Sequence, residues 1–188
     1  MLGGDLIDGT VSQVADALAP LGDLDAPLGV FAVRGNHEFI SQEADAWMDH
    51  GETLGIDVLR NENVTLTLGS ASIRMAASTT RPGADPTPPT STEPSPTSPH
   101  RPSRCSPRTS PRPPSAAGTG VDLQLSGHTH GGQLWPFRYA VPLQQPVIDG
   151  LAAVGDVPVL TSRGAGAWGP PVRVLAPPEI PVITLRAG

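Results

Sequence analysis

Three short motifs in the chain combine glycines with side chains that can bind metals. They are Gly4-Asp5-Leu6-Ile7-Asp8-Gly9, Gly35-Asn36-His37-Glu38 and Gly127-His128-Thr129-His130. Carboxylate, amide oxygen and imidazole together suit divalent metals such as Mn, Fe or Zn, and glycines let the backbone turn so that these groups converge. A His-x-His pair can offer its rings to two neighbouring ions that an Asp bridges, as in two-metal hydrolases. The motifs therefore predict a centre that cleaves phosphoesters.

Each motif also has a simpler interpretation when it is taken alone. The aspartates of the first motif could cap the helix expected to begin near Thr10. The second motif could be a turn, with Asn36 in the left-handed region and His37 on the surface. The third could be a polar turn, although two histidines and three glycines within six residues favour metal binding. The three motifs together favour the metal centre.

Hydrophobic periodicity predicts the elements that carry these motifs. The segment from Thr10 to Leu21 has the apolar spacing of an amphipathic helix. Ser41 can cap a second helix, with Ala44, Trp47 and Met48 facing inward and Gly55 just past its end. The expected strands are Leu28 to Val33 directly before Gly35, Val64 to Leu68, the segment around Ile73 and Met75, Val121 to Leu125 directly before Gly127, Val157 to Thr161, and Pro181 to Leu185. Helices mixed with strands early and strands late in the chain indicate an α/β sandwich.

The overall composition argues against several classes of protein. The 188 residues suffice for one compact domain. All twelve basic residues are Arg and the net charge is -6, which argues against a nucleic-acid-binding surface. Cys105 is the single cysteine, which excludes an internal disulfide and a zinc cluster built from cysteines. No apolar run is long enough for a membrane segment and no signal segment opens the chain, so we expect it to be soluble as written, and cytoplasmic by default.

The middle of the chain differs in composition from its flanks. From Ser78 to Ser115 it is almost entirely Pro, Ser, Thr and Arg, which cannot bury one face of a helix or strand. We therefore expect residues 76–117 to be a disordered segment between two parts of one domain, residues 1–75 and 118–188. Two Pro-x-x-Pro patterns, at 96–99 and 111–114, leave open a Pro-rich interaction or scaffold protein.

The three motifs resemble three of the five sequence blocks of the calcineurin-like metallophosphoesterases. The longer run Gly127-His-Thr-His-Gly-Gly-Gln-Leu-Trp-Pro-Phe137 is similar to one bacterial branch of that family, as is the tail Ser162-Arg-Gly-Ala-Gly-Ala-Trp-Gly-Pro-Pro171 with Arg173 and Glu179 after it. The resemblance covers roughly residues 1–75 and 118–188. It implies two mixed β-sheets sandwiched by helices, a four-layer α/β fold, with two divalent metal ions at the strand ends.

The resemblance also implies a ligand set for the two metals. Asp5 would bridge both ions, Asn36 and His128 would bind the second, and His130 would bind the first. By this count the first metal keeps two ligands and the second keeps three, which is few for catalytic ions.

The remaining motif residues would act on the substrate or support those that do. His37 would stabilise the transition state or protonate the leaving oxygen, and Glu38 would orient its ring. Asp8 would at most contact a ligand without binding a metal itself. The substrate would be a phosphomonoester or phosphodiester, and complete relatives in this branch often carry a membrane anchor or an export signal.

Two of the family's five blocks have no counterpart in the chain. The first, an Asp-x-His, would precede Met1, so we expect Met1 to be an internal or wrongly assigned start. The fourth, a buried strand ending in a ligand His, would fall in the Pro-rich segment. Read in another frame, with G or C at each third codon position, Pro102 to Pro111 permits Val-Ala-Val-Leu-Ala-Ala-His-Gln-Pro, and Ala76 to Arg81 permits Gly-Val-Asp-Asp-Pro.

Our hypothesis is that residues from about Ala77 to about Ser115 are a frameshifted translation. The use of Arg as the sole basic residue fits a GC-rich gene. Such a gene encodes mainly Pro, Arg, Ser and Thr when it is translated in the wrong frame. The sequence thus predicts a metal-dependent phosphoesterase that is impaired in this chain, with weak or no activity. A catalytically dead remnant and a Pro-rich interaction protein are the alternatives, and the sequence leaves substrate, metal identity and oligomeric state open.

Overall fold

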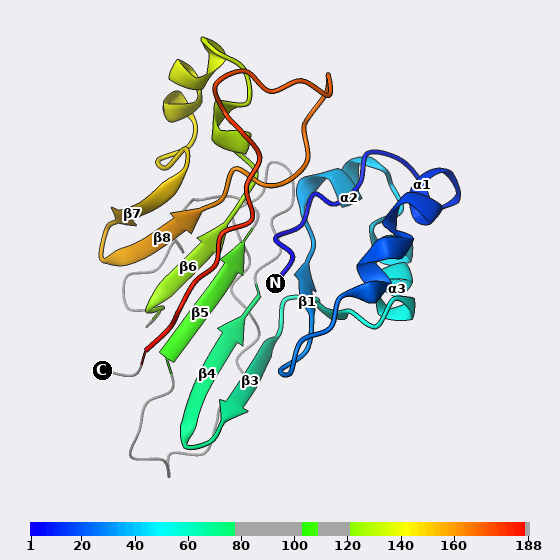
Figure 1. Cartoon of the computed structure of the whole chain (residues 1–188), viewed down its shortest axis with the longest axis vertical. Coiled ribbons are helices and arrows are strands. Elements are labelled where there is room, and N and C mark those ends of the chain that lie inside the picture. The colour runs from blue at the N-terminus through cyan, green and yellow to red at the C-terminus, as the bar shows by residue number, and fades with distance from the viewer. Residues whose placement is uncertain (78–102, 109–120, 187–188) are drawn as a thin grey trace.

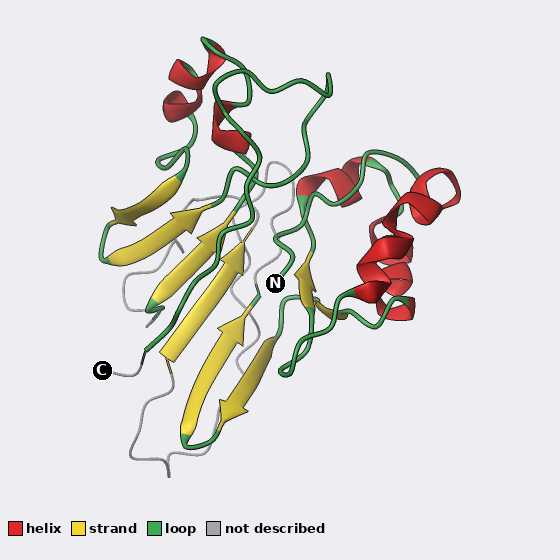
Figure 2. Ribbon diagram, in the orientation of Figure 1, coloured by secondary structure: helices red, strands yellow, loops and turns green. Residues whose placement is uncertain are grey.

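Two β-sheets and a small group of helices make up the part of the protein that the structure describes. The computed structural model describes residues 1–77, 103–108 and 121–186. The disorder and the Pro-x-x-Pro patterns expected within residues 78–102 and 109–120 lie outside the described residues. Three α-helices lie beside the amino-terminal strands, and a large sheet occupies the other half of the molecule (Figures 1 and 2).

The amino-terminal part contains three short α-helices, of which the sequence predicted two. They are α1 (Val11–Leu18), continued by the 3-10 helix η1 (Ala19–Asp23), α2 (Asn36–Ile40) and α3 (Ala44–Thr53). At the start of α1 the Thr10 N–H donates to the Gln13 side chain at 3.0 Å. α3 buries Trp47 and Met48 as predicted, and the chain turns after it at Gly55, where a φ of +77° requires glycine.

A small parallel sheet lies between these helices and the larger sheet. It consists of β1 (Phe31–Val33) and β2 (Asp57–Leu59), and Leu2 adds a parallel bridge to Ala32. All three residues of β1 are buried, and successive side chains of a strand point to opposite faces, so both faces of this sheet are covered. Ala32 and Val58 share one core cluster with Ile7, Trp47, Met48 and Ile56. Phe31, Val33 and Leu59 share another with Met75 and Ala77.

The larger sheet has six strands in the order β3-β4-β5-β6-β8-β7. The four central strands are parallel, and antiparallel pairing with β3 and with β7 closes the two sides. Its strands are β3 (Asn63–Leu68), β4 (Ala71–Ala76), β5 (Ser103–Arg108), β6 (Leu123–Ser126), β7 (Gly150–Val154) and β8 (Val157–Thr161). Segments that follow parallel strands leave the sheet at one edge, which brings the chain after β6 close to the chain after β8.

Strand β5 lies inside the segment whose composition predicted no strand. Its backbone pairs with β4 at Met75↔Cys105 and with β6 at Cys105↔Leu123. Hydrogen bonds between strands are made by the backbone, so a strand of unfavourable composition can still occupy the place between β4 and β6. Pro107 has no N–H to donate and is unusual in a strand that is paired on both sides.

One late strand expected from the sequence does not form. Residues 181–186 are irregular, and Val182 is 94% exposed. Pro181 has no N–H for a sheet, and the apolar pattern alone does not supply a partner strand. The sequence also missed β7, and it missed the 3-10 helices η2 (His130–Gly132), η3 (Phe137–Tyr139) and η4 (Val141–Leu143).

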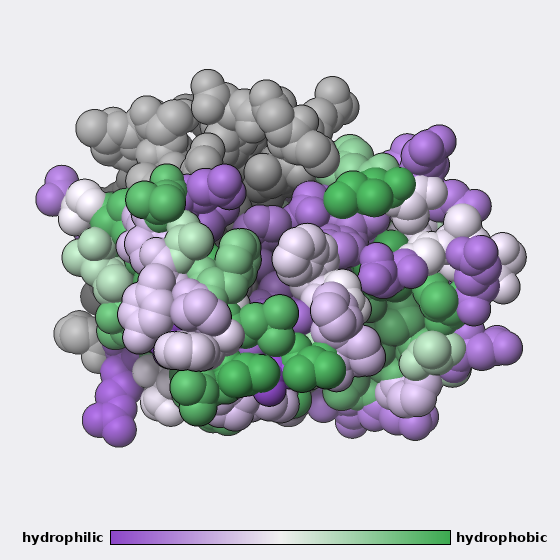
Figure 3. All heavy atoms as spheres, turned by 90° about the horizontal axis from the view of Figure 1, so that it is seen from above, coloured by the Kyte–Doolittle hydropathy of each residue, from purple (hydrophilic) through white to green (hydrophobic). Residues whose placement is uncertain are grey.

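The described residues confirm the expected α/β architecture of two sheets with helices. They supply three of its layers: the α-helices, the β1–β2 sheet and the six-stranded sheet. Seen from above, the molecule shows apolar patches among hydrophilic residues (Figure 3). Tyr139 and Leu143 are among the exposed large hydrophobic side chains of the described residues, at 70% and 86%. No helix in the described part of the chain is long and apolar enough to cross a membrane.

Candidate metal centre

Each of the three motifs comes directly after a segment whose backbone pairs in parallel with another strand. Gly4-Asp5 comes after the Leu2↔Ala32 bridge, Gly35-Asn36 comes after β1, and Gly127-His128 comes after β6. Chain segments that leave sheets at such ends converge, which is why α/β proteins commonly place their sites there. The fold therefore brings together motifs that are more than 120 residues apart, since His128 lies 123 positions beyond Asp5.

The glycines of the first two motifs let the backbones touch. Gly4 has a φ of +82°, and a Cβ added to it would lie 2.6 Å from the Gly35 nitrogen. A Cβ added to Gly35 would overlap the carboxylate and the backbone of Asp5. Only glycine at both positions allows this crossing, which places Asp5 directly against the start of α2.

Asp5 is the centre of the polar contacts among the motifs. Its Oδ1 accepts a hydrogen bond from the His37 N–H at 3.0 Å, and its Oδ2 lies 3.3 Å from His128 Nδ1. Burial alone would raise the pKa of Asp5, but the hydrogen bonds from His128 and His37 and the electrostatic attraction to their imidazoles outweigh it and lower the pKa below its usual value. Asp5 is therefore a carboxylate at neutral pH.

The backbone is strained at the residues that carry these groups. Asp5, His128 and His130 have φ values of +55°, +71° and +51°, a region that side chains other than glycine rarely adopt. Such strain is of order 1–3 kcal/mol at each residue and tends to gather at functional sites. Three of the four residues expected to bind metal thus adopt this conformation.

The structure corrects the expected role of Glu38. Its buried carboxylate accepts hydrogen bonds from the backbone N–H groups of Gly35, Leu6 and Asp5 at 2.7, 2.8 and 3.2 Å. Glu38 is the third residue of α2, from which a side chain reaches back to the helix start. The carboxylate beside the His37 ring is that of Asp8, 3.4 Å from Nδ1. Glu38 therefore holds the two loops together, and Asp8 faces the imidazole.

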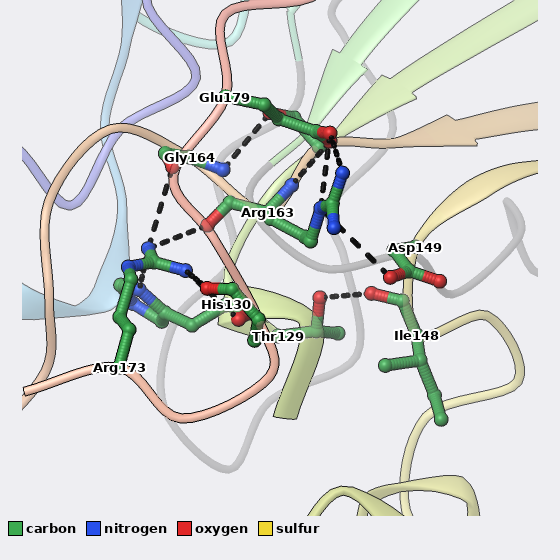
Figure 4. Close-up of polar contacts among 10 residues, drawn as sticks. Thr129, His130, Ile148, Asp149, Arg163, Gly164, Arg173 and Glu179 are labelled. Carbon is green, nitrogen blue, oxygen red and sulfur yellow. Dashed lines mark hydrogen bonds and ion pairs between the residues drawn. The ribbon is translucent and has the colours of Figure 1, made fainter. Parts of the chain in front are cut away.

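His130 is held by the carboxy-terminal part of the chain. The Arg173 guanidinium donates to the His130 carbonyl at 3.1 Å, and its Nη2 lies 3.2 Å from His130 Nδ1 (Figure 4). Burial lowers the pKa of His130, and the charge of Arg173 and the nearby imidazoles of His128 and His37 lower it further against the opposing effect of Asp5. Because a guanidinium can only donate, Nδ1 accepts the hydrogen bond from Arg173 and the neutral ring carries its proton on Nε2.

Sequence reasoning missed the residues that hold this loop. These residues entered only as members of the runs that carry the resemblance, with no role assigned to any of them: Gln133, Arg163, Arg173 and Glu179. Arg163 donates to Glu179 Oε2 from Nε at 3.0 Å and from Nη2 at 2.5 Å, while Gln133 Oε1 accepts the Trp168 N–H at 2.6 Å. No short sequence motif identifies such residues, because their hydrogen-bond partners lie far away in the sequence.

The side chains at this site are of types that bind divalent cations, but few of them lie close together. The carboxylate of Asp5 and the imidazole of His128 converge, and Asn36 begins α2 next to the His37 N–H that binds Asp5. Among residues 1–77, 103–108 and 121–186, no three His, Cys, Asp or Glu side chains form a group that could hold a metal ion. The site thus has the chemistry of a metal centre with fewer donors than the three that catalytic zinc sites use.

The fold and the motifs agree with those of the family whose model the sequence matches. The family described as calcineurin-like phosphoesterase matches residues 1–132, which is more than half of the chain. The chain belongs to this family, whose relatives are named metallophosphoesterases. That assignment confirms the expected fold class.

Several curated proteins are similar over nearly the whole chain. An uncharacterized metallophosphoesterase of Campylobacter jejuni is 33% identical over 190 residues, which is 97% of this chain and 49% of the relative. One of Helicobacter pylori is 34% identical, over 98% of this chain and 50% of the relative. A Bos taurus protein named transmembrane protein with metallophosphoesterase domain is 29% identical, over 98% and 45%. The chain therefore spans about half the length of these relatives. No solved structure matches.

Proposed function

We propose that this chain is part of a hydrolase that cleaves phosphomonoesters or phosphodiesters with divalent metal ions. The observation that carries the proposal is the convergence of Asp5 and His128, 3.3 Å apart, on left-handed backbone after separate parallel strands. Polar residues with strained backbone at the ends of strands are typical of preorganised functional sites. Family membership supports the same reaction class.

The residues that would hold two metals are those expected from the sequence. Asp5 would bridge the ions, with Asn36 and His128 on one side and His130 on the other. When bound, such ions polarise the phosphoryl group and the attacking water. Mn, Fe and Zn all accept this set of oxygen and nitrogen donors.

His37 is the residue we propose as proton donor to the leaving oxygen. Its backbone N–H donates to Asp5 Oδ1 at 3.0 Å, which holds the backbone of His37 next to that carboxylate. The Asp8 carboxylate lies 3.4 Å from His37 Nδ1 and orients the ring for this role.

We also propose that the segment around β5 is a frameshifted form of a strand that ends in a ligand histidine. Strand β5 lies between β4 and β6, and its last pair is Arg108↔Ser126, two positions before His128. In the alternative frame the histidine falls between Arg108 and Thr109, at this end of β5. A histidine there would lie beside the loop of His128 and raise the number of metal ligands.

Sequencing of the encoding DNA tests this second proposal directly. A one-base correction that restores a strand ending in His-x-Pro between codons 76 and 115 is the expected result. DNA that encodes the chain as written, with no such frame, would contradict the proposal and favour a natural remnant.

The function itself is tested by release of p-nitrophenol from aryl phosphate mono- and diesters. We expect weak release that requires added Mn²⁺ or Zn²⁺, and loss of release in Asp5→Ala. The exposed Asp16→Ala is the matched control, since it removes a carboxylate outside the motifs. Release that is equal in Asp5→Ala, or that is independent of metal, would refute the assignment. No release under any condition would favour a catalytically dead remnant.

A further inference from the structure

Large apolar side chains face solvent in two segments that follow β6 and β8. In and next to η3, Trp135, Phe137 and Tyr139 are 55%, 55% and 70% exposed. Proteins rarely expose several large apolar side chains in one place unless that place binds a partner or a membrane. We call the exposed side chains of residues 134–143 and 168–175 the aromatic surface. Its members are Trp135, Phe137, Tyr139, Leu143, Trp168, Val172, Val174 and Leu175.

Hydrogen bonds join the two segments of the aromatic surface. The Val174 N–H donates to the Gln133 carbonyl at 2.8 Å, and the Trp135 N–H donates to the Val174 carbonyl at 3.2 Å. The Gln133 side chain accepts the Trp168 N–H at 2.6 Å and donates to the Trp168 carbonyl at 2.5 Å. Both segments lie at the upper end of the molecule in Figure 1, where the yellow-green turns adjoin the orange loop. The exposed side chains therefore belong to one connected surface.

The two segments are basic in a chain that is acidic overall. Residues 128–148 include one arginine, Arg138, and no Asp or Glu. Residues 157–178 include Arg163 and Arg173, again with no Asp or Glu. The chain as a whole has a net charge of -6, so its acidic residues lie mostly elsewhere. This distribution of charge is complementary to an anionic partner.

Arg138 is the arginine of the aromatic surface that is available to such a partner. It lies in η3 between Phe137 and Tyr139, and its guanidinium makes no hydrogen bond or ion pair with the part of the chain that the structure describes. Arg163, in contrast, pairs with Glu179 at 2.5 Å. Exposed aromatic rings beside an arginine are typical of segments that lie at a membrane surface, where the rings enter the interface and the cation contacts lipid phosphates.

The aromatic surface is attached to the loop that carries the candidate metal centre. Thr129 Oγ1 donates to the Ile148 carbonyl at 2.5 Å, which ties the end of the first segment to that loop. A Cβ added to Gly132 would overlap the backbone of Arg138, so η3 packs directly against the residues that follow His130. A bilayer bound at the aromatic surface would therefore lie next to the loop of His128 and His130.

We propose that the aromatic surface docks on an anionic lipid bilayer, with its rings at the headgroup level and Arg138 on lipid phosphates. Trp and Tyr prefer the boundary between the hydrocarbon and water, because each has an apolar body and a polar group. Buried apolar area and the attraction of arginine to anionic lipids both add to binding. The inference is independent of the proposed function, since it involves neither a metal nor a reaction.

A second copy of the chain is the other occupant that an apolar surface of this kind could have. In a two-fold dimer the same patch meets itself, so Arg138 would face the region of its own copy. Residues 128–148 and 157–178 offer no carboxylate to pair with it, and like charges opposed in an interface are unfavourable. Anionic lipid headgroups pair with the arginine while the interface accepts the rings, and the observations therefore favour the bilayer.

The test is flotation of the full chain with two kinds of vesicle, one of phosphatidylcholine alone and one of equal parts phosphatidylcholine and phosphatidylglycerol. We expect the wild type to bind the anionic vesicles at least about 5-fold more tightly, and Arg138→Gln to weaken that binding by about 5-fold. Phe137→Ser should weaken it by about 10-fold. The matched controls are Arg186→Gln and Leu68→Ser, whose residues are exposed in the C-terminal segment and in β3, away from the upper end in Figure 1. Both controls should bind as the wild type does.

Tryptophan fluorescence adds a measurement on the wild type itself. Trp135 and Trp168 are each 55% exposed, whereas Trp47, the third tryptophan of the chain, is 4% exposed. Lipids with brominated acyl chains quench indole rings that enter the bilayer. We expect such lipids to quench the wild type, and to leave unquenched the double variant Trp135→Phe/Trp168→Phe, in which Trp47 alone emits.

Three results would overturn the inference. The first is equal affinity of the wild type for the two kinds of vesicle. The second is equal affinity of the wild type, Phe137→Ser and Arg138→Gln for anionic vesicles. The third is an absence of quenching by brominated lipids in the wild type, which decides the matter even where the variants do not fold. A dimer in sedimentation velocity that Phe137→Ser dissociates, in protein that binds no vesicles, would assign the surface to a second copy and overturn the inference as well.

Discussion

Replacement of Glu38 by glutamine should destabilise the protein although it changes one atom. The carboxylate accepts three backbone N–H groups: Oε2 those of Gly35 and Asp5, and Oε1 that of Leu6. Glutamine offers a single carbonyl oxygen, so its NH2 group must face at least one buried N–H. A lost hydrogen bond to a charged group is worth about 1.5–3 kcal/mol, and the remaining bonds weaken because they lose the charge. The expected loss is about 3 kcal/mol in the free energy of unfolding.

Urea unfolding followed by circular dichroism measures this loss. Glu52→Gln is the control, because the Glu52 carboxylate is 52% exposed and pairs with Arg60 at 3.0 Å on the surface. Its expected effect is within about 0.5 kcal/mol. Hydrogen exchange of the Leu6 amide should also accelerate in Glu38→Gln. An unfolding free energy equal to that of Glu52→Gln would refute the view that Glu38 holds the loops of the site.

Two further predictions concern backbone contact and pH. Gly35→Ala should lose about 2–3 kcal/mol because its methyl group overlaps Asp5, while Gly3→Ala, which has open space, should stay within about 0.5 kcal/mol; equal unfolding midpoints would contradict the crossing of the loops. The pKa of Glu179 is lowered, chiefly by its hydrogen bonds from Arg163, so its stabilising effect is present above its unfolded pKa of about 4.3 and is lost as pH falls through the folded value. Wild type and Glu179→Gln should therefore converge in unfolding free energy between about pH 5 and pH 3, and a constant difference would argue against the pair.

Much of the fold follows from local pattern in the sequence. The inward face of α3 and the termination before Gly55 were predicted because helical periodicity and a left-handed glycine are local signals. Helix α2 was missed because its five residues are too short for periodicity, and its Gly-Asn start favours a turn. Strand β5 was missed for a different reason: its pairing depends on the neighbouring backbones and not on its own side chains.

The site shows the same division between local and distant information. The motifs predicted which residue types gather, and Asp5 does lie beside His128. The position of Asp8, rather than Glu38, beside the His37 ring was not predictable, since it depends on how two loops distant in the sequence pack together at Gly35. Arg173 carried no local signal because main-chain carbonyls, which every residue possesses, are its principal partners.

The central claim is that Asp5 and His128 form the core of a metal site. Equilibrium dialysis against Mn²⁺, with the bound metal measured by elemental analysis, tests it most directly. The account predicts that the wild type retains Mn²⁺, that Asp5→Asn and His128→Ala lose it, and that the exposed Asp16→Asn keeps it. Equal Mn²⁺ content in the wild type and in both site variants would contradict the account.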